Sequence, residues 1–284
     1  MRDSQANDSS GESPVTRDRA SGEAAAWALW QDSPWGRLRY RVVARVLQEW
    51  CADLGEGPLR VLDAGGGDGR DAVQFALAGH SVTVLDRSPE MLALARAAAA
   101  AAGVGDRLHT VAADLEDLTA LAALTRHREG GSGSFDVVLC HDVLQHRESP
   151  GQVRADVATL VSSARPGGLV SLLAPNPAAD VVASVLREGP AAAWVALDGE
   201  RALDPGTGHT ALRLSPEFVE DALAAVGCDV TRRAGILAVT TLLEESDRVD
   251  DRVAADLEEL EVELSRREQF RGAARYWLLG GRRR

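Results

Sequence analysis

The sequence predicts an α/β fold with a doubly wound, mostly parallel sheet. Between residues 59 and 174, short apolar runs alternate with amphipathic stretches, which is the pattern of successive βαβ units. The first apolar run also leads into a glycine-rich turn that opens a helix. Such a turn brings a ligand to the edge of a parallel sheet.

Each element of this alternation has its own signal in the sequence. The predicted strands are Leu59–Asp63, Ser81–Asp86, Leu108–Ala112, Phe135–Cys140 and Leu169–Ala174. The helices predicted between them are Gly69–Ala78, Pro89–Ala102, Leu118–Arg126 and Gln152–Ser163. Ser88 is a good helix cap and Pro89 suits a first helical turn. Gly130–Ser134 is expected to be a surface loop.

The elements before the first strand form a second group. Residues 1–22 are polar and lack an apolar core, so we expect a disordered tail and no secretory signal. A helical entry follows, is broken at residues 32–34, and resumes from Leu38 to Ala52. Apolar side chains recur there at helical spacing, which predicts that this helix packs on the domain; they are Val42, Val43, Val46, Leu47 and Trp50.

The last hundred residues are less regular. A helix is predicted at Pro175–Arg187, whereas Glu188–Leu214 shows no clear periodicity. Another helix opens at Ser215 and ends at Gly227. The last two predicted strands are Cys228–Leu237 and Ala273–Leu279, with the acidic helix Asp250–Gln269 between them. We therefore expect one domain over residues 23–284, in which a segment at about 175–214 covers the substrate.

Composition limits the class of protein. The 284 residues are enough for one large core, and no apolar run approaches the roughly 20 residues that span a bilayer. The three cysteines lie far apart, so we expect no disulfide framework and a cytoplasmic location. The formal net charge is −12, which argues against a DNA partner. All 31 basic residues of the Lys+Arg class are arginines, so an arginine by itself carries little functional weight.

The glycine-rich turn, residues 61–70, carries the strongest functional signal. Asp63 precedes its glycines, and Asp86 closes the next predicted strand. An acidic residue at that place can accept hydrogen bonds from both hydroxyls of an adenosine ribose, in NAD or in S-adenosylmethionine. The turn lacks the Gly-x-Gly-x-x-Gly spacing that cradles a pyrophosphate. A sulfonium cofactor has no phosphate, so the turn favours S-adenosylmethionine.

These features resemble the class I methyltransferases. The residues that carry the resemblance are Val61–Arg70, Asp86, Ala113-Asp114-Leu115, Phe135–His141 and Arg165-Pro166-Gly167-Gly168. The resemblance implies a Rossmann-like sheet of seven strands, S-adenosylmethionine as cofactor, and methyl transfer as activity. The alternative is a nucleotide-binding domain with another ligand.

Within that family, the chain is most similar to the bacterial tRNA 5-carboxymethoxyuridine methyltransferases. The similarity is carried by Gly36-Arg37-Leu38-Arg39, Leu62–Gly67, His141-Asp142-Val143-Leu144 and the stretch from Leu257 to Tyr276. It implies that Arg39 pairs with the methionine carboxylate, Asp86 holds the ribose, and His141 lies near the methionine portion. The full set of candidate cofactor residues is Arg39, Asp63, Gly65, Gly66, Gly67, Asp86, Arg87, Asp114, Leu115 and His141. Arg39 could instead be a solvated arginine, His141 a structural histidine, and Asp86 a strand terminator.

Methyl transfer needs no catalytic triad when the acceptor is a carboxylate, because that group is already ionised, and the enzyme mainly aligns the reacting atoms. We find no convincing triad. Cations would orient the acceptor; the candidates are His146, Arg147, Arg187, Arg201, His209 and Arg213. Asp142 and Gln145 could contact the acceptor, although helix capping explains Asp142 equally well. Trp194 is expected in the core, with stacking on a base as the alternative. The histidines and cysteines suggest no metal site.

The acceptor half differs from the tRNA enzymes. Residues 187–214 hold acidic side chains beside only a few arginines, and Leu214 stands where those enzymes have an arginine. An RNA backbone would need cations there. The sequence therefore favours O-methylation of a carboxylate or hydroxyl of a small molecule. The alternatives are methylation of wobble 5-carboxymethoxyuridine in tRNA, and a non-catalytic regulator that binds adenosylmethionine or a nucleotide. The sequence predicts no oligomeric state.

Overall fold

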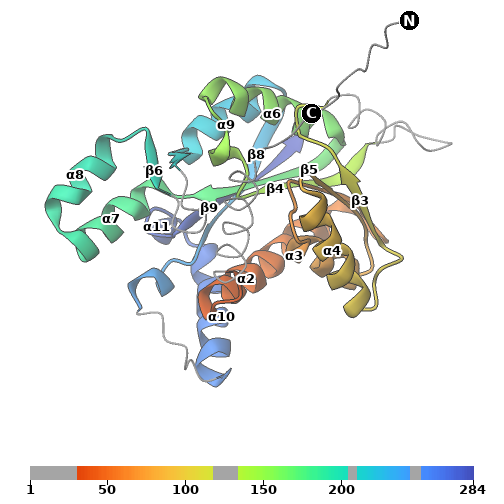
Figure 1. The fold of residues 1–284 in the computed structure, drawn as a ribbon, viewed down its shortest axis with the longest axis horizontal. Helices are drawn as coiled ribbons and strands as arrows, with labels where there is room; N and C mark the ends of the chain where they lie inside the picture. Colours follow the sequence, from red (N-terminus) through yellow and green to blue (C-terminus); the bar gives the residue numbers. More distant parts are fainter. Residues whose placement is uncertain (1–30, 118–133, 204–209, 244–250) are drawn as a thin grey trace, which may run out of the picture.

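The computed structural model describes residues 31–117, 134–203, 210–243 and 251–284. Within them, a sheet of seven strands forms the centre of the molecule (Figure 1). Its strands are β1 (Arg60–Ala64), β2 (Ser81–Asp86), β3 (Leu108–Ala112), β4 (Phe135–His141), β5 (Ala164–Pro175), β8 (Cys228–Ile236) and β9 (Tyr276–Arg283). The tail at 1–22, the helix predicted at 118–126 and His209 lie outside the described residues.

The strand order explains where a ligand can bind. The order is β3-β2-β1-β4-β5-β9-β8. Strands β1 to β5 pair in parallel, and β9 runs antiparallel to β5 and to β8. The order reverses between β1 and β4, and ligands of such sheets bind outside the carboxyl ends of the strands at that point. The predicted seven-stranded, mostly parallel sheet is confirmed.

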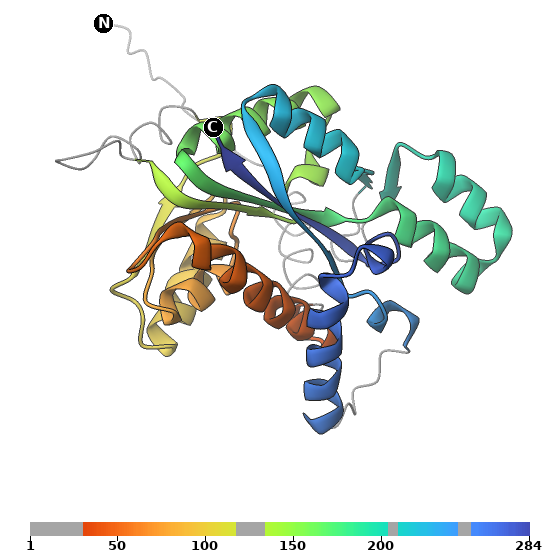
Figure 2. The same cartoon turned by 180° about the vertical axis from the view of Figure 1, so that it is seen from behind.

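Helices cover both faces of the sheet. One face carries α2 (Pro34–Cys51), α3 (Arg70–Leu77), α4 (Pro89–Ala101) and α10 (Asp251–Ser265), whereas α6 (Pro150–Ser163) and α9 (Pro216–Ala225) cover the other (Figures 1 and 2). The buried apolar side chains accordingly form two large clusters, one on each face. None of the described helices has both the length and the apolar character that a bilayer crossing requires.

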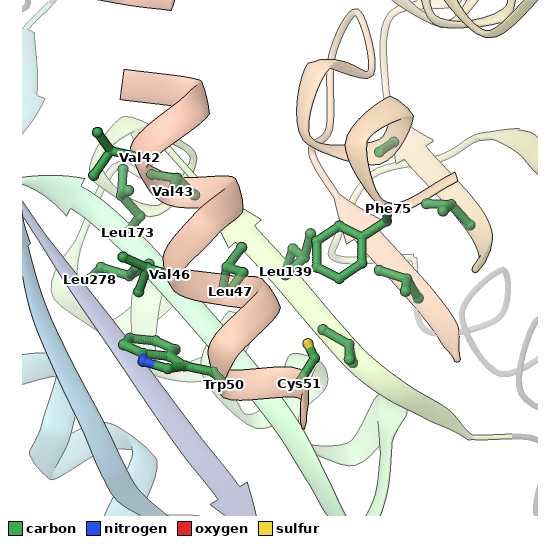
Figure 3. Packing of buried hydrophobic residues seen from close by; sticks show 14 of the residues in the cluster. Val42, Val43, Val46, Leu47, Trp50, Cys51, Phe75, Leu139, Leu173 and Leu278 are labelled. Atoms are coloured by element: carbon green, nitrogen blue, oxygen red, sulfur yellow. The ribbon is translucent and has the colours of Figure 1, made fainter. Parts of the chain in front are cut away.

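Helix α2 packs on the sheet as its periodicity predicts. Ser33 caps it by accepting a hydrogen bond from the Gly36 N–H, and Pro34 occupies its first turn. Figure 3 shows its apolar side chains, Val42, Val43, Val46, Leu47 and Trp50, toward Leu139, Leu173 and Leu278 of the sheet. Each fully buried Val or Leu contributes roughly 1.5–3 kcal/mol relative to an exposed one. This packing fixes Arg39, which lies on the same helix, against the carboxyl ends of the strands.

The structure corrects several boundaries. Strand β5 begins at Ala164, five residues before the predicted start at Leu169. It includes Arg165-Pro166-Gly167-Gly168 as an irregularity, where the pairing with β4 shifts between Phe135 and Val137. Strand β9 extends to Arg283, well past the predicted end at Leu279. The acidic helix ends at Ser265, and a short α11 (Glu268–Arg271) follows.

The segment after β5 is more ordered than its sequence suggests. It holds α7 (Pro177–Glu188), α8 (Pro190–Asp198) and a hairpin of β6 (Arg201–Leu203) with β7 (Thr210–Leu212). Helix α8 escaped prediction because its buried residue is Ala193, whereas its large apolar residues face solvent. Trp194 is 67% exposed, so the expectation that it packs in the core is wrong.

Candidate active site

The glycine turn joins β1 to α3 at the carboxyl edge of the sheet. The N–H groups of Gly65 and Gly66 donate to the Leu85 carbonyl at 2.7 and 3.3 Å. Gly65 has a φ of +74°, and a Cβ there would lie 2.6 Å from the Val143 side chain. A Cβ on Gly66 would lie 2.5 Å from the Asp63 carboxylate. Glycine is therefore needed at both places for the backbone to pass so close to its neighbours.

Asp86 ends β2 beside this turn. One of its carboxylate oxygens accepts the Gly67 N–H at 3.0 Å and the other accepts the Ser88 N–H at 2.8 Å. A carboxylate offers about four acceptor positions, so each oxygen of Asp86 can accept one more hydrogen bond. The two backbone donors hold the carboxylate in an orientation that suits a pair of ribose hydroxyls. Arg87, the next residue, is exposed.

Asp63 is the most buried carboxylate of the turn. Its side chain lies near Asp71, Asp86 and Asp68, and its Oδ2 atom has no hydrogen-bond partner among the described residues. Burial, together with the nearby Asp71 and Asp86, raises the pKa of the Asp63 carboxyl well above its usual value. A buried acceptor among like charges favours a cationic ligand group, such as a sulfonium or an ammonium.

Arg39 supplies a cation at the same edge. It is 1% exposed and its Nη2 lies 2.5 Å from a carboxylate oxygen of Asp142, which stands just after β4 at a φ of +57°. The rings of Tyr40 and Tyr276 lie 4.6 and 5.3 Å from its guanidinium. Burial would lower the pKa of Arg39, but the nearby Asp142, Tyr40, Asp71 and Tyr276 together outweigh burial and raise it. The reading of Arg39 as a solvated arginine is therefore wrong.

The guanidinium of Arg39 is not fully satisfied. Its Nε atom is buried and has no hydrogen-bond partner among the described residues. Buried polar atoms without partners are rare in native proteins and call for an explanation. The Arg39 Nε donor and the Asp63 Oδ2 acceptor suit the carboxylate and the ammonium of an amino acid, so the site fits the methionine portion of S-adenosylmethionine.

The ring of His141 is engaged inside the protein. Its Nδ1 lies 2.8 Å from Asp71 and its Nε2 lies 3.0 Å from the Ser171 hydroxyl. Burial would raise the pKa of Asp71, but the hydrogen bond and charge of His141 and the charge of Arg39 lower it. Both ring nitrogens thus serve local structure, which favours the structural reading of His141. A contact between the His141 backbone and the methionine portion stays a prediction.

Asp114 and Leu115 follow β3, on the far side of β2 from the glycine turn. Asp114 accepts hydrogen bonds from the Glu116 N–H and from Arg147 Nη2, both at 3.1 Å. Burial would raise the pKa of Asp114, but these two donors and the Arg147 charge lower it. Leu115 is buried. The pair offers an ionised carboxylate beside an apolar side chain, which suits a purine with an exocyclic amino group.

Comparisons with known proteins agree with this geometry. Residues 61–168 match the model of a methyltransferase domain family. The ubiquinone biosynthesis O-methyltransferase of Rhizobium etli (strain CIAT 652) is 32% identical over 237 residues, which cover 77% of this chain and 84% of that protein. The chain belongs to the S-adenosylmethionine-dependent methyltransferases.

Other methyltransferases match over less of their length or only in fold. The tRNA 5-carboxymethoxyuridine methyltransferase of Escherichia coli (strain K12) is 36% identical over 138 residues, 49% of this chain and 48% of that protein. The chain thus matches about half the length of this relative. The magnesium protoporphyrin IX methyltransferase of Synechocystis PCC 6803 with bound SAH, the demethylated product of the cofactor, superposes with a TM-score of 0.58. It is 19% identical, over 95% of this chain and 100% of that one. This likeness shows the shared fold.

Three of the candidate acceptor cations of this methyltransferase have partners within the protein. Arg213 pairs with Asp180 at 3.1 Å and donates to the Pro177 carbonyl. Arg201 donates to the carbonyls of Thr210, Arg147 and Glu148. Arg147 pairs with the buried Asp156 as well as with Asp114. Arg147, Arg201 and Arg213 thus all have partners within the protein, and a contact between any of them and an acceptor stays a prediction.

The remaining acceptor candidates are few. Arg187 and His146 are exposed, on α7 and on the short helix η2 (Leu144–His146). Gln145 is buried and its Oε1 atom has no hydrogen-bond partner among the described residues. Asp142 forms the ion pair with Arg39 described above. The described part of the chain contains no group of three or more metal-ligating side chains.

Four residues of the site escaped the sequence analysis: Tyr40, Asp71, Ser171 and Tyr276. Asp71 stands in the first turn of α3, where an acidic residue usually serves the helix dipole. Tyr40 follows Arg39 directly, and that neighbourhood could have drawn attention to it. Ser171 and Tyr276 come from distant parts of the chain, and only the pairing of β4 with β5 and of β5 with β9 brings them to the site.

Proposed function

We propose that this methyltransferase moves the methyl group of S-adenosylmethionine to an oxygen atom, a carboxylate or a hydroxyl, of a small molecule. One observation carries the cofactor part of the proposal. The unpartnered Nε of Arg39 and the unpartnered Oδ2 of Asp63 are buried near the end of β1 and the start of α2, and they match the two charged groups of the methionine portion.

The residues then have separate tasks. Arg39 holds the methionine carboxylate, and Asp63 with the backbone of Gly65 and Gly66 faces the cationic groups. Asp86 orients the ribose, and Asp114 with Leu115 receives the adenine. The positive charge of the sulfonium disappears in the reaction, so the protein's main contribution is to hold the acceptor oxygen, the methyl carbon and the sulfur in line.

The proposal of a small-molecule acceptor rests on the partners that the candidate acceptor arginines contact. Arg201 and Arg213 are committed to internal partners, and the same segment exposes Glu188, Asp198 and Glu200. An RNA backbone would meet repulsion there rather than charge-assisted hydrogen bonds. A carboxylate acceptor needs no base, whereas a hydroxyl acceptor needs one; the exposed His146 is the candidate for that task.

The proposed function also gives roles to the parts of the chain outside the cofactor site. We infer that residues 23–284 form one domain, that the segment at about 175–214 covers the acceptor, and that the protein works in the cytoplasm. The match to a tRNA methyltransferase over half the chain supports wobble 5-carboxymethoxyuridine as the second candidate acceptor. A regulator that binds adenosylmethionine or a nucleotide without catalysis is the third possibility.

Calorimetry with S-adenosylhomocysteine tests the cofactor site. We expect saturable binding of S-adenosylhomocysteine and none of NAD, because the turn lacks a pyrophosphate cradle. Arg39→Met should weaken binding strongly, while Arg37→Met, which changes an exposed arginine of the same helix, should not. Binding of NAD without S-adenosylhomocysteine would refute both enzyme readings, methylation of a small molecule and methylation of tRNA.

A further inference from the structure

Helices α7 and α8 form an arm that stands away from the rest of the molecule. Figures 1 and 2 show the two helices side by side, extending beyond the carboxyl end of β5. The base of the arm is fixed. The Asn176 side chain donates to the carbonyls of Arg271, Gly272 and Ala274, and Arg213 clamps the first turn of α7 through Asp180 and Pro177.

The arm carries its apolar side chains on the outside. The residues buried in it are Ala179 and Ala193, whereas six large apolar residues are between 46% and 76% exposed. The exposed ones are Val182, Val185 and Leu186 on α7 and Trp194, Val195 and Leu197 on α8. On α7 they follow the i, i+3, i+4 spacing of a single helix face. This is the reverse of a surface helix that packs its apolar face inward.

The exposed apolar area is a large share of what a stable interface needs. At their exposed fractions, the six side chains present roughly 600 Å², the upper limit of the largest patch on a typical monomer. A standard protein interface buries about 800 Å² on each partner. The fixed base also means that the arm loses little conformational freedom when it is covered.

The charges on the arm indicate what kind of partner can cover its apolar surface. Arg187, Glu188 and Asp198 are exposed and form no ion pair with any residue in the described ranges. Interfacial helices and nucleic-acid surfaces need a surplus of cations, and here acidic residues outnumber the single arginine. A small molecule would need a concave pocket, whereas this surface lies on a protruding pair of helices. A second copy of the chain suits it, because the surface carries both signs of charge and can complement itself about a two-fold axis.

We infer that the α7–α8 arm is a dimer interface, in which the apolar faces of two arms pack together as a bundle of four helices. Arg187 of each arm then lies where an acidic residue of the other copy can pair with it. The inference concerns assembly and is independent of which acceptor the enzyme methylates. It assigns the outer faces of α7 and α8 to a second copy, so that the rest of the segment at about 175–214 is left to cover the acceptor.

Sedimentation velocity on the full chain, at concentrations from about 1 to about 100 µM, tests this dimer. We expect the mass of two chains, with dissociation on dilution. The double variant Leu186→Glu/Val195→Glu should raise the dimer dissociation constant by about thirtyfold or more, the scale for losing an interface hot spot. The matched control is Leu94→Glu on α4, because Leu94 is 54% exposed and lies outside the arm; it should leave the dimer intact.

Circular dichroism and S-adenosylhomocysteine binding show whether each variant is folded. A wild-type chain that stays monomeric over the whole range overturns the inference. A dimer that survives in the folded double variant overturns it as well, because the interface then lies elsewhere. Binding of the monomer to neutral phosphatidylcholine vesicles, lost in the double variant, would assign the arm to a lipid surface instead.

Discussion

Asp86 keeps one acceptor position free on each of its carboxylate oxygens, because backbone donors of Gly67 and Ser88 occupy only one position each. We therefore expect Asp86→Ala to weaken the binding of S-adenosylhomocysteine by about 1–3 kcal/mol, the scale for losing buried hydrogen-bond partners. Calorimetry measures this change. Asp106→Ala, at an exposed aspartate before β3, is the control. Unchanged affinity in a folded Asp86 variant would leave Asp86 as a mere strand terminator.

We expect Asp63 to make cofactor binding depend on pH. Because its pKa is raised, Asp63 in the free protein takes up a proton at a higher pH than an ordinary aspartate does. A cationic ligand favours the ionised form and lowers that pKa, so binding releases a proton and affinity rises as the pH rises through the pKa of the free protein. Calorimetry in buffers of different ionisation enthalpy counts the released protons. Asp63→Asn should abolish the release, and a release that persists in this variant would contradict the role.

Single residues of the site were predictable where a local motif surrounds them. Asp63, Gly65, Gly66 and Asp86 lie within or beside the glycine turn, and the structure places them together. Which side chains pair with one another in the site was not predictable. That Asp71 takes the His141 ring and Asp142 takes Arg39 depends on distances between separate elements, and no spacing in the sequence encodes those distances.

At the scale of elements, Arg147 links the end of β3 to α6. It joins Asp114 to the buried Asp156, so it fixes the carboxylate that we expect to accept the adenine amino group. Arg147→Met should lower the preference for S-adenosylhomocysteine over its inosine analogue, which has an oxygen in place of that amino group. Arg154→Met, at an exposed arginine of α6, should keep the preference. A folded Arg147 variant with full discrimination would contradict the assignment.

The elements of the first half were predictable because their periods are clear and their ends carry caps. Ser88 caps α4 as predicted. Helix α2 begins at Pro34 with Ser33 as its cap, earlier than the predicted start at Leu38. The segment from 188 to 214 was not predictable, because α8 buries alanines and the β6–β7 strands are short. The large apolar residues of α8 lie on its exposed face. Their spacing therefore does not follow the pattern by which a buried helix face is predicted.

At the scale of the whole molecule, charge separates the two acceptor classes. The chain carries a net charge of −12, and the arginines that could face an acceptor are mostly tied to carboxylates or carbonyls of the protein itself. Long-range attraction to a nucleic acid is therefore weak. The enzyme is expected to recognise a small acceptor by local contacts near the end of β4, where Gln145 keeps a buried acceptor atom.

The most direct measurement supplies methyl-labelled S-adenosylmethionine and the enzyme to an extract of a host strain that lacks its gene. The extract is then separated into tRNA and small molecules. We predict label among the small molecules, and less of it when the Asp86→Ala variant replaces the wild-type enzyme. Label in tRNA that is lost on mild ester hydrolysis would contradict the small-molecule assignment and establish the wobble uridine as the acceptor.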